Sequence, residues 1–136
     1  MQEEFAISTK KKQELIDITS KIKSIIKKSR VRSGVCNVFA AHATAAIIIN
    51  ENYDQNICLD LLDALNKLVP SGIWRHDKID GNADAHIKSA MLGPQETIPI
   101  KDGELELGRW QSCMFAELDG PRSNRKIIVT VIGDKD

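Results

Sequence analysis

Val-Cys-Asn-Val-Phe-Ala (residues 35–40) and Ala-Ala-Ile-Ile-Ile-Asn (residues 45–50) give the clearest indication of fold class in this chain. Both segments are rich in β-branched and small side chains and carry no charge, which is typical of buried strands. The connection between them, residues 41–44, is Ala-His-Ala-Thr, so His42 lies between two predicted strands.

Further short apolar runs predict more strands toward both ends of the chain. They comprise residues 4–8 and 15–18 before this pair, and residues 97–100, 105–107, 113–118 and 126–132 after it. Asp102-Gly103 and Asp119-Gly120-Pro121 separate later runs, and Asp-Gly pairs between apolar runs indicate hairpins. The later strands are therefore predicted to pair in antiparallel fashion.

Three segments show the apolar spacing of helices that pack one side against a sheet. Thr19 is the predicted N-cap of the first helix. Ile22, Ile25, Ile26 and Ser29 lie at helical spacing along it. Asp54 is the predicted cap of a helix that ends near Leu68, and Asn82 precedes a predicted helix over residues 83–92. The predicted fold class is α+β: mostly antiparallel sheet(s) with about three helices packed on one face.

Composition limits the classes of protein to be considered. A length of 136 residues without a Pro/Gly/Ser-rich linker predicts a single domain over residues 1–136. Lys plus Arg and Asp plus Glu number 19 each, which argues against a general nucleic-acid binder. No membrane span and no signal peptide are visible, so the predicted location is the cytoplasm. The three cysteines, without a C-x-x-C pair, are interpreted as buried free thiols.

The three histidines, His42, His76 and His86, are the first candidates for chemistry. Three neutral imidazoles can hold a divalent transition metal and leave a coordination position for water or substrate. Their spacing matches no standard metal motif, so the alternative for each is a satisfied core or surface residue.

The segment Asp80-Gly81-Asn82-Ala83-Asp84-Ala85-His86 is the most informative one. Gly81 permits a sharp turn, and Asn82 as a helix cap would leave backbone N–H groups that suit an anion. Asp84 is either a general base, a partner that orients a histidine, or a residue that only favours the helix dipole. Arg122 is a candidate phosphate ligand, with a surface ion pair as the alternative.

Taken together, these motifs resemble the YjbQ family, also called UPF0047, across nearly the whole chain. The resemblance rests on His42-Ala43-Thr44-Ala45-Ala46-Ile47, Asn50-Glu51-Asn52, His76, Gly81-Asn82-Ala83-Asp84-Ala85-His86-Ile87-Lys88-Ser89, Ile98-Pro99-Ile100 and Asp119-Gly120-Pro121-Arg122. It implies a YjbQ-like fold and a homotrimer with a pocket that contains the three histidines. It also implies site residues, with Glu51 and Ser89 as weaker candidates beside His42, His76, Asn82, Asp84, His86 and Arg122.

The resemblance implies a function as well. Some members are called secondary thiamine-phosphate synthases, which join a pyrimidine pyrophosphate to a thiazole phosphate with loss of pyrophosphate. The first hypothesis is therefore a metal-assisted enzyme that acts on a phosphorylated small molecule. In it, Asp84, His86 and His42 are catalytic, and Asn82, Arg122, Ser89 and Glu51 bind substrate. His42, His76 and His86 hold a divalent metal ion, Zn or Mg.

Two further hypotheses stay open. The same pocket could belong to a non-catalytic metabolite, anion or metal-binding protein, which would bind phosphate esters without turning them over. Alternatively, trimer formation could itself be the function, with the apolar stripe of residues 57–68 or a strand edge as the contact. A carboxylate and histidines in one short segment favour the enzyme.

Overall fold

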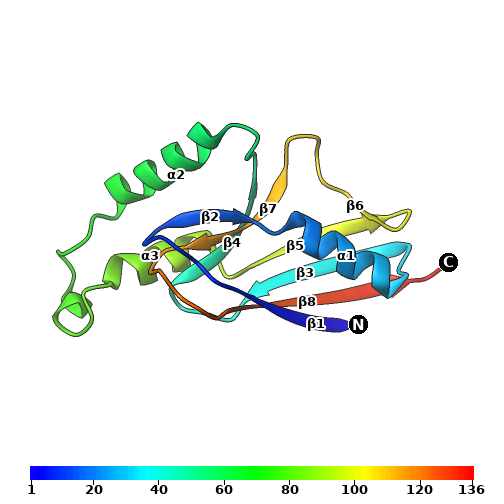
Figure 1. Cartoon of the computed structure of the whole chain (residues 1–136), viewed down its shortest axis with the longest axis horizontal. Helices are drawn as coiled ribbons and strands as arrows, with labels where there is room; N and C mark the ends of the chain where they lie inside the picture. Colours follow the sequence, from blue (N-terminus) through cyan, green and yellow to red (C-terminus); the bar gives the residue numbers. More distant parts are fainter.

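The computed structural model describes all residues, 1–136, as two antiparallel sheets with three α-helices and one short 3₁₀ helix (Figure 1). The strands are β1 (Gln2–Ile7), β2 (Glu14–Asp17), β3 (Ser33–Ala40), β4 (Ala45–Asn50), β5 (Gln95–Lys101), β6 (Glu104–Leu105), β7 (Ser112–Glu117) and β8 (Arg125–Asp134). The helices are α1 (Thr19–Ser29), α2 (Gln55–Leu68), η1 (Arg75–Lys78) and α3 (Ala83–Leu92). The α+β prediction with antiparallel strands and three α-helices is confirmed.

The two sheets divide the strands in an order that the sequence does not follow. The larger sheet has the order β1-β8-β3-β5-β6 and the smaller one the order β2-β7-β4. β3 pairs with β8 from Ser33↔Asp134 to Ala40↔Ile127, and β4 pairs with β7 from Ala45↔Glu117 to Asn50↔Ser112. Consecutive strands β3 and β4 therefore lie in different sheets, and His42 lies where the chain crosses between them.

The main core lies between the sheets and beneath α1. Strand alternation turns Cys36 and Val38 of β3 inward, both fully buried, while Val35 and Phe39 stay exposed on the opposite side. The stripe Ile22, Ile25, Ile26 and Ser29 of α1 is buried, as predicted. The inward side chains of the strands and the buried stripe of α1 thus pack into one core.

A second, smaller core lies on the outer face of the three-stranded sheet. There Ile48 of β4 and Met114 of β7 pack against Cys58 of α2 and Leu92 of α3. All three α-helices consequently lie on the same side of the five-stranded sheet. The C-terminal end of α2 is less well covered, because Leu68 is 69% exposed.

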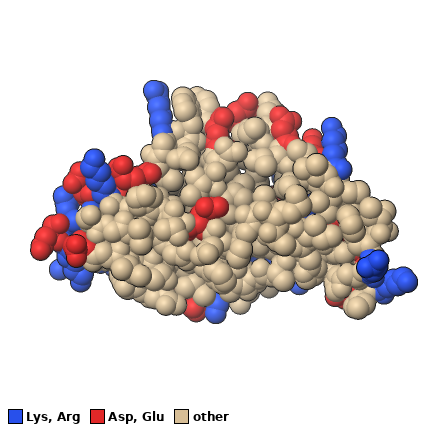
Figure 2. Space-filling model, turned by 180° about the vertical axis from the view of Figure 1, so that it is seen from behind, with Lys and Arg blue, Asp and Glu red and all other residues tan.

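The opposite face of the five-stranded sheet has no helix over it. Its exposed side chains include Val35, Phe39 and Ile132. Figure 2 shows the molecule from behind, and charged side chains gather at the edges of this face while few occupy its centre. No helix of the chain is long and apolar enough to cross a membrane.

Two local predictions were wrong. Thr19 is the first residue of α1 and not its cap, which is Ile18. The Thr19 hydroxyl instead accepts the N–H of Cys113 at 2.9 Å and so ties the helix start to β7.

The second wrong prediction concerns the turn Asp119-Gly120-Pro121, which makes no hairpin because β7 and β8 belong to different sheets. Gly120 N–H donates to the carbonyl of Lys12 at 2.9 Å, and Thr9 N–H donates to that of Arg122 at 2.8 Å. The crossing segment therefore pairs with the β1–β2 connection. The Asp102-Gly103 turn does form the predicted hairpin, between β5 and β6.

Candidate functional site

Two of the three histidines meet in one open depression, here called the histidine cleft. His76 comes from η1 and His86 from α3, and their rings lie edge to face with centroids 5.0 Å apart. The depression measures about 700 Å³. Its walls are Ile73, Trp74, Arg75, His76, Ala83, His86 and Ile87. Two imidazoles, one indole and one guanidinium therefore face a common space.

Asp77 fixes η1 against the start of α3 and so holds the two histidines together. Its carboxylate accepts the N–H of Trp74 and the N–H of Ala83, both at 3.0 Å. These backbone hydrogen bonds hold the pKa of Asp77 below its usual value. The side chain of Asn82 makes no cap bond. The helix start that the sequence predicted as an anion site is therefore already bonded to Asp77.

His42 lies apart from this pair. Its Nε2 accepts the backbone N–H of Lys126 at 2.7 Å. Burial and the charge of Arg125 lower the pKa of His42, so the ring is neutral and its Nδ1 carries the proton. In this state His42 offers a hydrogen-bond donor. Within one chain, no group of three His, Cys, Asp or Glu side chains is placed to hold a metal ion.

Asp84 faces away from His86, although only one residue separates them. Two positions along a helix turn a side chain by about 200°. The Asp84 carboxylate accepts a hydrogen bond from the Lys88 ammonium at 2.8 Å, and Lys88 is fully buried. Lys88 also donates to Oδ1 of Asn66 at 2.7 Å, which links α3 to α2. Asp84 therefore does not orient His86.

Asp84 instead lines a second depression of about 550 Å³, here called the polar cleft. Its walls are Lys12, Gln13, Asn66, Pro70, Ser71, Gly81 and Asp84. No apolar side chain except the proline ring faces it, so it suits a hydrogen-bonding ligand or ordered water. The helix α3 separates this cleft from the histidine cleft.

Asn82 and Arg122 converge on Asp119. Asn82 Nδ2 donates to the Asp119 carboxylate at 2.9 Å, and Arg122 donates to the same oxygen at 3.0 Å. Lys12 pairs with the other oxygen. Burial would raise the pKa of Asp119, but these three donors outweigh it and hold the pKa below its usual value. The Arg122 side chain is thus already engaged, and Asn82 Oδ1 remains buried without a donor.

A buried ion pair between Glu117 and Arg125 lies next to the groups that surround Asp119. Glu117, which has no exposed surface, accepts from Arg125 Nε at 2.9 Å and from the Thr9 hydroxyl at 2.7 Å. Arg125 also donates to the Thr44 hydroxyl at 2.9 Å. Burial opposes ionisation, yet these bonds hold the pKa of Glu117 below its usual value. The network ties both sheets together next to His42.

The two weaker candidates lie in different surroundings. Ser89 is buried on α3, and its hydroxyl has no hydrogen-bond partner. Glu51 follows β4 and lies at the opposite end of that strand from His42. Six strand residues span about 20 Å, so Glu51 does not reach His42 of its own chain.

Sequence reasoning missed Asn66 and Asp77, which organise the site, and it placed Lys88 beside an anion or in solvent, whereas Lys88 is buried and paired with Asp84. Asp84 and Lys88 stand four positions apart on one helix, and that spacing alone favours an ion pair. The burial of Lys88 and its bond to Asn66 depend on how α2 and α3 approach each other. No local pattern in the sequence indicates that approach.

Comparisons with known proteins match most of the chain to one family. The sequence profile of the family described as UPF0047 protein YjbQ-like matches residues 3–134. A UPF0047 protein of Methanocaldococcus jannaschii is 46% identical over 131 residues, 96% of this chain and 94% of that protein. The UPF0047 protein YugU of Bacillus subtilis is 36% identical over 120 residues, 86% of this chain and 89% of that protein.

Solved structures show the same fold. A YbjQ-like protein of Sulfolobus solfataricus, described as of unknown function, superposes with a TM-score of 0.95 at 38% identity. That superposition covers 98% of this chain and 97% of the other. A yjbq/upf0047-family protein of Clostridium acetobutylicum gives a TM-score of 0.91 at 40% identity over 96% of this chain and 99% of that one. The similarity therefore spans both clefts.

Proposed function

The chain belongs to the UPF0047 YjbQ-like family, and we propose for it the function that the geometry of the histidine cleft supports best. It is a cytoplasmic, homotrimeric, metal-assisted enzyme that acts on a phosphorylated small molecule in the histidine cleft. The observation that carries this proposal is the pair of imidazoles, His76 and His86, with ring centroids 5.0 Å apart in an open depression.

The donor set of the cleft suits a transition metal. Imidazole nitrogen favours zinc over magnesium, which prefers oxygen ligands. His76 and His86 would hold the ion, and a bound zinc ion would supply Lewis-acid polarisation of a phosphoryl oxygen. Arg75 lies beside them as the charged group for the phosphate, and Trp74 offers a flat surface for an aromatic ring.

A site with all three histidines requires a second copy of the chain. His42 lies elsewhere in its own chain, so it would have to come from a neighbouring subunit and exchange its bond to Lys126. The outer face of the five-stranded sheet, which exposes Val35, Phe39 and Ile132 and carries few charges at its centre, supports self-association (Figure 2). A Phe39→Glu variant should shift the protein from trimer to monomer in sedimentation equilibrium, whereas an unchanged trimer would exclude this face as the contact.

The proposed reaction class is the joining of a pyrimidine pyrophosphate to a thiazole phosphate. Trp74 would stack on the pyrimidine, and Arg75 would bind the departing pyrophosphate. Because Asp84 is paired with Lys88 on the other side of α3, its geometry favours a structural role over that of the base. Asn82 and Arg122 would act by holding Asp119 and the start of α3.

A non-catalytic binding protein is the second candidate, and one observation favours it. Apart from the two histidines, no acid or base lines the histidine cleft; the Asp80 carboxylate lies 3.9 Å from Nε2 of His76, and Asp77 is bonded to backbone N–H groups. Such a site could bind a metal and an anion without chemistry.

Pyrophosphate release from the two substrates distinguishes the candidates. The zinc-loaded enzyme should release pyrophosphate, the His86→Ala variant should not, and Asp84→Asn should retain most of the rate. Saturable binding of both substrates without release would instead establish the binding protein. A fully active His86→Ala variant would refute the assignment of the reaction to the histidine cleft.

A further inference from the structure

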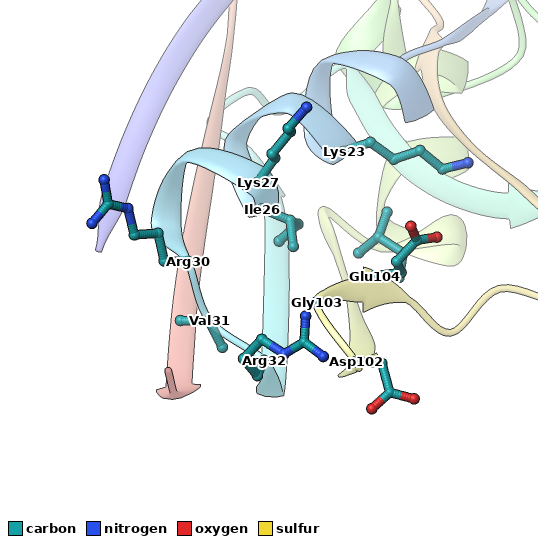
Figure 3. Close-up of a pocket in the computed structure, with 10 residues that line it drawn as sticks. Lys23, Ile26, Lys27, Arg30, Val31, Arg32, Asp102, Gly103 and Glu104 are labelled. Carbon is teal, nitrogen blue, oxygen red and sulfur yellow. The ribbon is translucent and has the colours of Figure 1, made fainter. Parts of the chain in front are cut away.

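A third depression lies at the far end of the molecule from α3, between the C-terminal end of α1 and the β5–β6 hairpin (Figures 1 and 3). It measures about 410 Å³ and is here called the basic cleft. Neither the histidines nor the Asp84 network contributes to it. Its floor is apolar, since Ile26 is 1% and Val31 5% exposed.

Positive charge dominates the basic cleft. Lys23, Lys27, Arg30 and Arg32 line it, and Figure 3 shows Lys23 and Lys27 extending from α1 and Arg32 directed toward Gly103. Glu104 lies near Lys23, whereas the carboxylate of Asp102 is directed outward. None of these cations forms an ion pair, although Lys28 on the same helix pairs with Glu3. The lining holds four cationic side chains and two carboxylates, which is a local excess of positive charge in a chain with zero formal net charge.

The backbone holds Arg32 in place. Its N–H donates to the carbonyl of Asp134 at 2.7 Å, and its carbonyl accepts the N–H of Gly103 at 3.0 Å. A side chain at Gly103 would crowd this arginine, because an added Cβ would lie 3.3 Å from its guanidinium. Gly103 also has a φ of 80°, which favours glycine. The hairpin turn thus keeps room for a guanidinium over the cleft.

We propose that the basic cleft binds a compact, multiply charged phosphate anion, of the size of pyrophosphate, independently of the histidine cleft. Two lysines of α1 and two arginines of the connection that follows it line one small space, which suits several charge-assisted hydrogen bonds to one anion. The cleft has no aromatic residue on which a base could stack, and acidic residues border it. Both features disfavour a nucleic-acid strand.

The test is calorimetric titration of the full chain with inorganic pyrophosphate in metal-free buffer. The variant is K27Q/R32Q, and the matched control is K21Q/K28Q. Both remove two positive charges from the same stretch, but Lys28 pairs with Glu3, Lys21 lies over the Phe5 ring, and neither lines the cleft. Circular dichroism verifies that both variants are folded.

We expect one pyrophosphate per chain, with a Kd raised about a hundredfold in K27Q/R32Q, about tenfold for each charged hydrogen bond lost. The control and a His76→Ala/His86→Ala variant should bind as the wild type does, which separates this site from the histidine cleft. Equal weakening in both charge variants, or loss of binding only in the histidine variant, would overturn the proposal. Binding of an RNA oligonucleotide that pyrophosphate does not displace would also overturn it.

Discussion

Replacing Lys88 with methionine should destabilise the protein strongly, because it leaves the Asp84 carboxylate buried without its cation. Lys88 is fully buried, and the Asp84 side chain is 11% exposed. Removing one partner of a buried ion pair costs about 3–5 kcal/mol, a large part of the total stability of a small domain. Asp84→Leu should cost a similar amount, since it leaves the ammonium with Asn66 as its only acceptor.

The double variant Lys88→Met/Asp84→Leu makes this prediction specific. Two apolar side chains of similar volume can replace a buried pair at little cost, so we expect it to lie within about 2 kcal/mol of the wild type. Urea denaturation followed by circular dichroism, at one fixed protomer concentration, measures all four proteins. Additive losses in the double variant would refute the idea that the two charges stabilise the fold by neutralising each other.

Three further predictions concern other parts of the molecule. Because the pKa of His42 is lowered in the folded protein, the neutral ring contributes fully to stability above the unfolded-state pKa of 6.5, and this contribution is lost as the pH falls through the folded-state pKa. The urea midpoint of His42→Gln should therefore change less between pH 7 and pH 5 than that of the wild type. Burial raises the pKa of Cys36 to about 11 and that of Cys113 to about 12, so both should react with a thiol reagent at pH 8 only after unfolding. Fast labelling of either in the native protein would contradict the burial. Gly34→Ala would place a Cβ 2.0 Å from the carbonyl oxygen of Ile132, and should cost about 3 kcal/mol or more in urea denaturation; wild-type stability would contradict this packing.

The elements of the fold follow from local patterns, but their partners do not. Residues 45–50 alternate little and are almost wholly apolar, and they do form a buried strand. That same uniform pattern carries no information on which sheet the strand joins. The residues of the turn Asp119-Gly120-Pro121 suit a hairpin, whereas the backbone hydrogen bond from Gly120 to Lys12 places the turn in a crossing between sheets.

In the candidate site, too, local sequence patterns predict some features, whereas contacts between distant segments determine the others. His76 and His86 lie ten residues apart, and Asp77 brings them together through a bond to Ala83 that no spacing rule predicts. The sequence leaves Asp84 as a base, an orienting partner of a histidine or a residue that favours the helix dipole, and helical geometry alone could have placed it on the face opposite His86. The burial of Lys88 depends on α2, whose position no residue of α3 determines.

Elemental analysis of protein purified without a metal-affinity tag tests whether the histidine cleft holds a metal ion. We expect a near-stoichiometric transition metal that is lost in His76→Ala and in His86→Ala, and retained in Asp84→Asn, whose residue faces the other side of α3. A protein that holds no metal even after reconstitution with zinc, or a His86→Ala variant that keeps its full metal content, would contradict it.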